Sequence, residues 1–489
     1  MIADDVLAMP WVPTPTDGID SAETLRVQLE AEQRISSLLT EYMGSQSQPL
    51  LQKDQHLGFL TKLLRNPFPR MFTSLDASRP WLLYWTIHAL ALFEADLDPA
   101  SKTRVVETLK AMQNPEGGFG GGPGQLSHLA PSYAAVCALA YVGEEGWKAI
   151  DRAGMYRFLM SVKQPDGSFI MHEGGEVDVR GCYCALTIAT LLNILTPDLA
   201  AGTSSFIASC QTYEGGLAAA AHPYAFDGAS SANPSPLGEA HGGYTFCAAA
   251  SWSMLRVFSD PESPCFAEAP LDLARSELDV RALLRWSASM QAMPIEGGGF
   301  RGRTNKLVDG CYSWWCGGLF PIIDGLLAEE SPVEDELYDR NGLQQYITLV
   351  AQHPGGGLRD KPACHPDAYH TCYNLSGDSS AQSRMQFSAS KQASLAEQFV
   401  SPFNRPRFED DADDADARVE MIKGANESDE AAEVRMRQVW SRSLAWEQKG
   451  EKLLYGGEEN ELMPNHPIFN LTSTTARRML DYFYLQPSV

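Results

Sequence analysis

Five side chains of reactive type follow a recurring Gln and a glycine-rich turn at similar distances. They are His128, Arg180, His241, Asp309 and His370. Four of them lie 15 to 18 residues after their Gln, and His241 does so once an Ala/Pro/Ser-rich insert is discounted. In a closed array of repeated helices, equal offsets place such groups at one rim, around the mouth of one cavity. Helix N-termini converge there too, which favours an anionic ligand.

Three of the side chains near this rim are candidate metal ligands. Asp309 and Cys311 are two residues apart, and with the distant His370 they could form a three-ligand site with an open position. Spacing alone does not separate this from a buried Cys and a satisfied core His. Cys316 and Cys372 are equally possible ligands on this evidence.

Basic groups and a phenol fall near the same rim. They are His241, Arg303, Lys306 and Tyr312. Arg offers a fork of donors and Lys a compact charge, so the set would suit a diphosphate. Solvated loop charges are the alternative interpretation.

Aromatic residues could line an apolar cavity. Trp81 and Trp85 are four residues apart in RPWLLYWTIHAL, so they share one face of a helix that begins with a Pro. Tryptophans at this spacing usually belong to a core. Together with Tyr183, Tyr244, Trp315 and Tyr373, they could instead surround a long hydrocarbon.

The elements that must position these groups are repeated helix pairs. Five segments carry a Gln followed by a glycine-rich turn, and apolar helical runs follow, such as YCALTIATLLNIL from Tyr183 and YTFCAAASWSMLRVF from Tyr244. Strand-like alternation is almost absent. Helix pairs at a fixed period predict a solenoid or a closed toroid. Because the second helices are apolar nearly all round, we expect an inner ring shielded by an outer ring. The prediction is an all-α barrel of about six pairs over residues 60–376, closed by the chain from Pro464 onward.

The remaining segments differ in composition. We predict an N-terminal extension with the first helices over 1–60, the barrel over 60–377, an acidic low-complexity insertion over 378–458 and a closing C-terminal helix over 459–489. Between Glu409 and Glu433 there are 11 acids against two basic residues. We expect this insertion to be a surface excursion, mostly disordered or loosely helical.

Bulk composition excludes several classes of protein. A net charge of -24 argues against a general nucleic-acid or anionic-membrane surface. No apolar run reaches membrane-spanning length, and the N-terminal residues lack the pattern of a secretory signal. Ten scattered cysteines without paired spacing indicate a reducing, cytoplasmic compartment.

Six long strings in order identify a family. LDASRPWLLYW, GGPGQLSHLAPSYAAV, GGEVDVRGCYCA, EAHGGYTFC, GRTNKLVDGCYSWW and DKPACHPDAYHTCYNLSG resemble the β subunits of protein farnesyltransferases, with NHPIFN near residue 465 resuming the match. The resemblance covers about two thirds of the chain. It implies an α6/α6 barrel that works as an obligate heterodimer with an α subunit.

The resemblance also implies roles for individual residues. Asp309, Cys311 and His370 match the ligands of one zinc ion, whereas Cys316 and Cys372 do not. His241, Arg303, Lys306 and Tyr312 match the diphosphate-binding positions; Arg180, Tyr183, Tyr244, Cys247 and Trp315 match the isoprenoid wall; Trp81, Trp85, His128, Ala130, Pro131 and Tyr369 match the wall facing a CaaX peptide. Asp360 matches a position that places Mg²⁺ on the diphosphate.

The chemistry implied is transfer of farnesyl from farnesyl diphosphate to the Cys thiol of a CaaX protein, such as a Ras-like GTPase. Zinc would lower the pKa of that thiol, and the cationic groups would stabilise the leaving diphosphate. We expect the last CaaX residue to be Met, Ser, Gln or Ala.

Three other functions remain to be weighed. The geranylgeranyltransferase type I β subunit resembles this chain but carries a small residue at Trp81 and a Lys at Asp360. Triterpene cyclases share Gln/Gly-rich helical repeats, but they need an acidic motif such as DxDD or DCTAE, and neither occurs here. A helical scaffold without catalysis is disfavoured because every zinc-matching position is retained.

Overall fold

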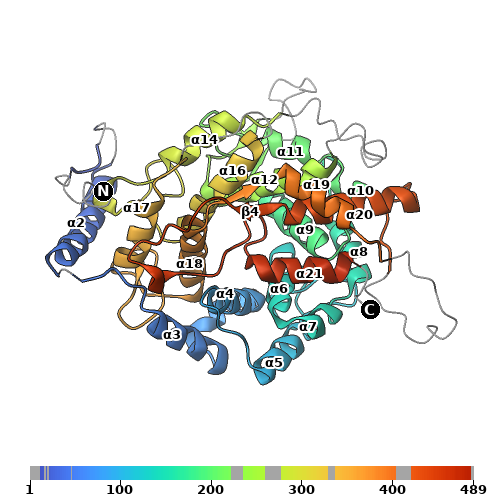
Figure 1. The fold of residues 1–489 in the computed structure, drawn as a ribbon, viewed down its shortest axis with the longest axis horizontal. Helices are drawn as coiled ribbons and strands as arrows, with labels where there is room; N and C mark the ends of the chain where they lie inside the picture. The colour runs from blue at the N-terminus through green and yellow to red at the C-terminus, as the bar shows by residue number, and fades with distance from the viewer. Residues whose placement is uncertain are drawn as a thin grey trace.

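The computed structural model describes residues 12–15, 18, 21–45, 47–221, 235–258, 277–328, 336–402 and 420–485. Their helices form two concentric rings, and we call the interior of the inner ring the lumen (Figure 1). The outer ring consists of α3 (Lys53–Arg65), α5 (Pro99–Lys110), α8 (Arg152–Val162), α11 (Thr203–Ser209), α14 (Val280–Ser289) and α17 (Arg340–Gln345), the last continuing into the π-helix η5 (Tyr346–Ala351). The inner ring consists of α4 (Arg79–Leu92), α6 (Leu129–Val142), α9 (Val179–Leu191), α12 (Gly242–Leu255), the pair α15 (Tyr312–Trp315) and α16 (Phe320–Ala328) joined by η4 (Gly317–Leu319), and α18 (Ala368–Gln382).

The inner ring is closed. Each inner helix packs against the next, and the last, α18, packs against the first, α4. The all-α, α6/α6 barrel predicted from the sequence is therefore confirmed. The predicted limits at residues 60 and 377 fall inside α3 and α18, so the two rings extend slightly beyond both.

Burial explains why the inner helices lack a polar face. In α9 every residue except Arg180 is buried, and in α6 only Ala130 and Tyr141 are partly exposed. The outer ring covers one side of these helices, and neighbouring inner helices pack along their flanks. An apolar surface all round is the expected composition for this position.

The recurring Gln fastens four of the repeats to the next outer helix, whereas Gln164 donates to the Val162 carbonyl instead. In these four, the side-chain oxygen of the Gln accepts the backbone N–H of the residue that begins the next outer helix. Its side-chain NH₂ group donates to a nearby backbone carbonyl. The bonds to the N–H run from Asp151 to Gln113, from Asp279 to Gln211, from Asp339 to Gln291 and from Gln52 to Gln352, at 2.8–3.0 Å. The fourth bond joins the last repeat to the first, so the same contact that spaces the repeats also closes the ring.

The glycines after the Gln allow close packing. Gly117 has a φ of +103°, and a Cβ there would lie 1.8 Å from the carbonyl oxygen of Gly154, in the first turn of α8. No other residue type tolerates both the left-handed backbone and this contact.

Smaller elements complete the described chain. They are α2 (Ala22–Ser45), η1 (Arg70–Ser78), α7 (Glu144–Lys148), α10 (Pro197–Ala200), β1 (Ala220–Ala221), β2 (Pro236–Leu237), η2 (Arg256–Phe258), η3 (Pro294–Glu296), β3 (Met385–Phe387), α19 (Ala389–Gln398), α20 (Asp429–Leu444), β4 (Trp446–Gln448), η8 (Glu458–Asn460) and α21 (Ser473–Tyr484). The strands form two antiparallel pairs, β1 with β2 and β3 with β4. None of the helices in the described ranges is both long and apolar enough to cross a lipid bilayer.

The sequence predicts a surface excursion over 378–458, mostly disordered or loosely helical; its described residues instead form ordered helices that pack on one another. In Figure 1, α19, α20, β4 and α21 lie together across one end of the barrel, where α20 packs on both α19 and α21. On α20, Met436, Val439 and Trp440 are buried. This helical spacing was present in the sequence, but the surrounding charges obscured it. The acidic run over 408–418 lies outside the described residues.

A buried ion pair anchors this layer. Arg435 of α20 and Glu427 are both almost fully buried, with 2.6 Å between Nε and Oε1. Arg435 also donates to the backbone carbonyl of Leu195, in the loop after α9. The layer is therefore tied to the barrel itself.

We predict that Arg435→Met destabilises the protein by about 3–5 kcal/mol, because it leaves the Glu427 carboxylate buried without its partner. The control is Arg437→Met on the exposed face of the same helix, which should change stability by less than about 0.5 kcal/mol. Thermal or urea unfolding of both variants measures the difference. Equal stabilities would show that the layer contributes nothing to the fold.

Candidate functional site

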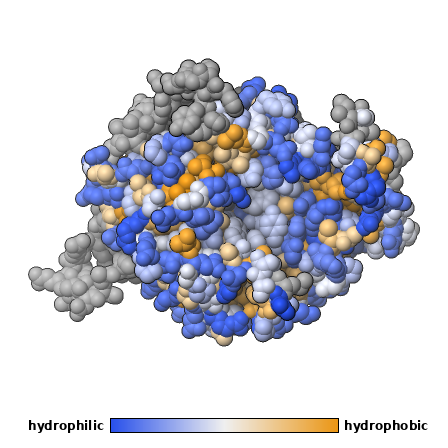
Figure 2. All heavy atoms as spheres, turned by 180° about the vertical axis from the view of Figure 1, so that it is seen from behind, coloured by the Kyte–Doolittle hydropathy of each residue, from blue (hydrophilic) through white to orange (hydrophobic). Residues whose placement is uncertain are grey.

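Capping residues of the inner helices gather at the end of the barrel opposite α20 and α21. His128, Asp178, His241 and Asp367 are the N-caps of α6, α9, α12 and α18, and each side chain accepts a backbone N–H of its helix. Figure 2 views this end, whose surface is hollowed near its centre. The fold therefore brings reactive side chains and helix N-termini together at one rim, as the sequence predicts.

Asp309, Cys311 and His370 come together at this rim. One ligand atom from each lies within 4.8 Å of the others. His370 Nε2 is 3.4 Å from Asp309 Oδ1, and the same carboxylate oxygen accepts the backbone N–H of Cys311. A carboxylate, a thiol and an imidazole at this spacing suit a tetrahedral zinc site that keeps one position open.

Asp367 orients the imidazole of His370. Its Oδ2 lies 2.8 Å from His370 Nδ1, and its Oδ1 accepts the backbone N–H of His370. The proton on Nδ1 is thus held by Asp367, which leaves Nε2 facing Asp309. A carboxylate behind a His ligand is a common way to fix its tautomer and ring plane.

The protonation states of the three groups depend on one another. Burial lowers the pKa of His370, but the hydrogen bonds and charges of Asp309 and Asp367 outweigh it and raise that pKa to about 10. Burial and the Asp309 carboxylate raise the pKa of the Cys311 thiol well above its usual range. Without a cation, His370 is charged and Cys311 is a neutral thiol.

The structure decides between the cysteines that the sequence left open. In the described residues, the cluster of potential ligands contains Cys311 alone among the cysteines. Cys316 Sγ lies 3.5 Å from the carbonyl of Arg301, and Cys372 is fully buried in α18. Neither faces the cluster.

A second group at the rim centres on His241 and Tyr312. His241 Nδ1 accepts the N–H of Gly243, so its proton lies on Nε2, which donates to the Tyr312 hydroxyl at 3.0 Å. Burial and the nearby Arg303 lower the pKa of His241. A neutral His241 therefore leaves the hydroxyl proton of Tyr312 available to a ligand.

Cationic side chains border this pair. Arg180 makes a double hydrogen bond to the buried Asp178 and lies over the Tyr244 ring, with 5.6 Å to the ring centroid. Arg303 pairs with Glu239, and Lys306 is exposed. The side chains predicted to bind diphosphate therefore lie at the rim, where Arg303 is already paired with the Glu239 carboxylate.

Below the rim, aromatic rings form a closed belt around the lumen. Successive neighbours have ring centroids 4.6–5.7 Å apart, in the order Trp81, Tyr133, Tyr183, Phe246, Trp315, Tyr373, Tyr369, Trp85 and back to Trp81. Every inner helix contributes to it. Trp81, Trp85, Trp315 and Tyr369 are only half-buried. An aromatic wall of this kind suits a long apolar ligand.

Sequence reasoning missed two members of the belt, Tyr133 and Phe246. Each lies five residues after the cap of its helix, as Tyr183 does after Asp178. That register was a usable signal, and it would have placed both residues in the wall. Cys247, predicted to lie in the isoprenoid wall, is fully buried behind this layer of rings.

The residues predicted to face a peptide lie on both sides of the lumen's mouth. His128 caps α6 and its Nδ1 accepts the N–H of Ala130, with Pro131 in the same turn. Burial, with the neighbouring His172, lowers the pKa of His128 to about 4, so it is neutral. Tyr369 precedes His370 and accepts a hydrogen bond from Trp315 Nε1 at 3.2 Å.

Asp360 adjoins the metal-ligand cluster through the backbone, because its carbonyl accepts the N–H of Gly310 at 2.7 Å. Its Oδ2 is shared by Lys361 and Cys364. Its Oδ1 is buried and has no hydrogen-bond partner among the described residues. Burial and the Asp309 charge raise its pKa.

Comparison with known proteins agrees with this arrangement. Residues 51–471 match the family described as the prenyltransferase alpha-alpha toroid domain. The chain is 40% identical over 391 residues to the protein farnesyltransferase subunit beta of Pyricularia oryzae, covering 75% of this chain and 70% of that protein. It is 32% identical over 248 residues to the geranylgeranyl transferase type-1 subunit beta of Arabidopsis thaliana, covering 50% of this chain and 57% of that protein.

A solved structure shares the fold. The structure of Candida albicans protein geranylgeranyltransferase-I complexed with GGPP superposes with a TM-score of 0.57 and covers 89% of this chain and 99% of that chain. Because the two chains are only 18% identical, this likeness supports the shared fold alone.

The ligand geometry predicts that Cys311→Ala abolishes binding of zinc, because it removes the thiol of a three-ligand set. Cys316→Ala is the matched control, a buried thiol five residues away that faces elsewhere. Metal content of the purified variants measures the outcome. Full zinc occupancy in Cys311→Ala would exclude this ligand set.

Zinc binding should also release protons. Because the pKa values of His370 and Cys311 are both raised in the metal-free chain, binding must displace about two protons near pH 7. Affinity for zinc should therefore fall as the pH is lowered. Calorimetric titration in buffers with different ionisation enthalpies counts the protons, and binding without proton release would contradict the charge states assigned here.

Proposed function

Because this chain belongs to the family of protein farnesyltransferase β subunits, we propose that it is the catalytic subunit that transfers farnesyl from farnesyl diphosphate to the Cys thiol of a CaaX protein. One observation carries the proposal. The cluster of Asp309, Cys311 and His370 stands at the mouth of an aromatic lumen, beside cationic groups, so thiol, lipid and leaving group could meet at one place.

The rim residues fit one zinc ion. Asp309, Cys311 and His370 would hold it, with Asp367 keeping His370 in the tautomer that presents Nε2. When bound, zinc lowers the pKa of the substrate thiol, so that a thiolate is available near neutral pH. The sulfur of that thiolate attacks C1 of the farnesyl group, forming a thioether and releasing diphosphate.

The chain's own side chains serve the leaving group. His241 donates to Tyr312, which leaves the Tyr312 hydroxyl to donate to a diphosphate oxygen. Arg303 and Lys306 supply charge where negative charge develops, and such preorganised donors lower the barrier to bond cleavage. Arg303 must exchange Glu239 for the diphosphate when substrate binds.

The lipid and peptide would share the aromatic lumen. Tyr183, Tyr244 and Trp315 offer ring faces to the isoprenoid, and Trp81 stands at its far end. Trp85, His128 and Tyr369 would face the CaaX side chains.

Magnesium would act at Asp360. Its buried Oδ1 has no hydrogen-bond partner in the part of the chain that the structure describes, and carboxylate with phosphate oxygens is the ligand set that Mg²⁺ prefers. The neighbouring Lys361 already offsets part of the Asp360 charge, so its contribution to affinity should be modest.

The partners follow from the family. We propose an obligate heterodimer with a prenyltransferase α subunit, and CaaX proteins such as Ras-like GTPases as substrates. A cytoplasmic location is supported by the cysteines of the described residues, which are all free thiols.

Geranylgeranyl transfer is the second candidate, and the structure bears on it through Trp81. The Trp81 indole packs against Tyr84 and Tyr133, with ring centroids 6.0 and 5.6 Å away. Because of this contact, the indole has little room to move away from a fourth isoprene unit. The packing of Trp81 therefore favours farnesyl over geranylgeranyl as the lipid.

The direct test is co-expression with a candidate α subunit, followed by transfer assays with both isoprenoid diphosphates and one CaaX peptide. We expect farnesyl transfer to depend on the α subunit and on zinc. Zinc-dependent transfer of geranylgeranyl alone would replace the proposed substrate, and no transfer with either would exclude the activity.

We predict that Trp81→Thr raises geranylgeranyl transfer relative to farnesyl transfer. An overpacked contact costs about 1–3 kcal/mol, which corresponds to about 5- to 150-fold in kcat/KM. The measurement is the ratio of kcat/KM for the two diphosphates in wild type and variant. An unchanged ratio would make Trp81 an ordinary core residue.

A further inference from the structure

Three tyrosines of successive inner helices hold the segment that closes the far end of the lumen, which we call the closing segment (residues 462–472). Tyr84 on α4, Tyr133 on α6 and Tyr183 on α9 donate their hydroxyls to its backbone. The acceptors are the consecutive carbonyls of Asn470, Phe469 and Ile468, at 2.7, 3.0 and 2.9 Å. Each of the three helices therefore contributes one tyrosine, and each tyrosine bonds to one carbonyl of the segment.

The closing segment is a tight turn of fixed shape. His466 donates its backbone N–H to Leu471 at 2.7 Å, and the Ile468 N–H donates to His466 Nδ1. Asn470 has a φ of +52°, a left-handed conformation that Asn adopts more readily than most residues. Its carbonyl and those before it therefore face the inner helices as a rigid set.

The side chain of Asn470 is held as well. Tyr141 accepts the N–H of Thr472 at 2.9 Å and so donates its own proton to His88 Nδ1 at 2.6 Å. His88 then carries its proton on Nε2, which lies 3.2 Å from Asn470 Oδ1. Burial lowers the pKa of His88 to about 3, so the ring stays neutral.

Two of the three tyrosines also support Trp81. The Tyr84 and Tyr133 rings lie 5.7 Å apart, edge to face, and the Trp81 indole rests on both. Tyr84 and Tyr133 are fully buried, whereas Trp81 is half-buried. The order from the lumen outward is therefore indole, tyrosine pair and closing segment.

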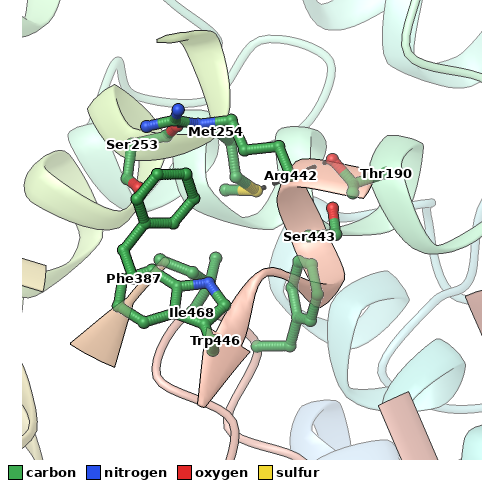
Figure 3. Close-up of a pocket in the computed structure, with 9 residues that line it drawn as sticks. Thr190, Ser253, Met254, Phe387, Arg442, Ser443, Trp446 and Ile468 are labelled. Carbon is green, nitrogen blue, oxygen red and sulfur yellow. Dashed lines mark hydrogen bonds between the residues drawn. The ribbon is translucent and has the colours of Figure 1, made fainter. Parts of the chain in front are cut away.

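On its outer side the closing segment borders a small cavity (Figure 3). Ile468 and Phe469 line it together with Met254 and with Phe387 and Trp446 of the β3–β4 pair. Packing is incomplete there, and on this side His466 Nε2 donates to the Ser443 carbonyl at 2.8 Å, whereas the three tyrosines hold the segment from inside the barrel.

We propose that the closing segment, through Tyr84 and Tyr133, sets how far Trp81 can retreat and so determines the length of isoprenoid accepted. These residues are positioning residues, since they act on the lipid through the indole. The inference rests on the proposed function, in which the lumen holds a prenyl diphosphate.

The test is the double variant Tyr84→Phe/Tyr133→Phe, co-expressed with the α subunit. This variant keeps both rings but removes both hydrogen bonds to the closing segment. The Trp81 indole should then move aside for a longer isoprenoid. We expect the ratio of kcat/KM for farnesyl over geranylgeranyl diphosphate to fall by about threefold or more, since each lost bond has a modest net energy. Zinc content should not change.

Tyr484→Phe is the matched control. Tyr484 is a fully buried tyrosine of α21 that donates to the carbonyl of Thr190 at 2.8 Å, with no contact to the closing segment among its hydrogen bonds. It should lose stability as the double variant does but keep the wild-type ratio. If the double variant does not fold, Tyr133→Phe alone carries the test, with a smaller fall expected.

The outcomes separate the two proposals. If wild type transfers farnesyl and Trp81→Thr moves the ratio while neither tyrosine variant does, the role of the closing segment is excluded and the proposed function stands. If Tyr484→Phe shifts the ratio equally, general loosening explains the effect and the inference is wrong. If wild type transfers neither lipid, the proposed function itself fails.

Discussion

The hydrogen bonds of the recurring Gln are the constraint on which the rest of this structure depends. Such bonds join the ends of three repeats, at Gln113, Gln211 and Gln291, to the first residue of the next outer helix, and Gln352 joins the last repeat to the N–H of Gln52. An open array would leave the apolar inner helices exposed at its two ends. Closure gives all six the same environment, so they can be apolar all round and still surround a lumen.

Closure also decides the electrostatics of the rim. The loops that carry the Gln lead into the inner helices, so the N-termini of those helices all face one way. Their caps, among them His128, His241 and Asp367, are the same residues that orient the reactive groups. A cap that accepts through Nδ1 must hold its proton on Nε2, which is how helix capping fixes the tautomer of His241 before any substrate arrives.

At the opposite end, segments distant in sequence are combined into a floor. The closing segment takes hydrogen bonds from four inner helices, α4, α6, α9 and α18, and α20 and α21 lie at the same end. The buried pair of Arg435 and Glu427 ties α20 to the loop after α9. In the proposed function, chemistry and length selection would therefore take place at different ends of one barrel, linked by the aromatic belt.

The sequence by itself determined the repeat, the fold class and the identity of the reactive residues, because Gln spacing, apolar periodicity and the strings around Asp309 and His370 are local signals. Spacing alone could not choose Cys311 over Cys316 and Cys372. The resemblance made that choice, and the tertiary structure agrees with it, because Cys311 alone among the cysteines of the described residues lies beside Asp309 and His370. The sequence also did not reveal that α20 is part of the fold: its buried face is short, and acidic neighbours mask its periodicity. The carbonyls that receive Tyr84 and Tyr133 were decided by the tertiary structure, which brings together residues up to 386 positions apart.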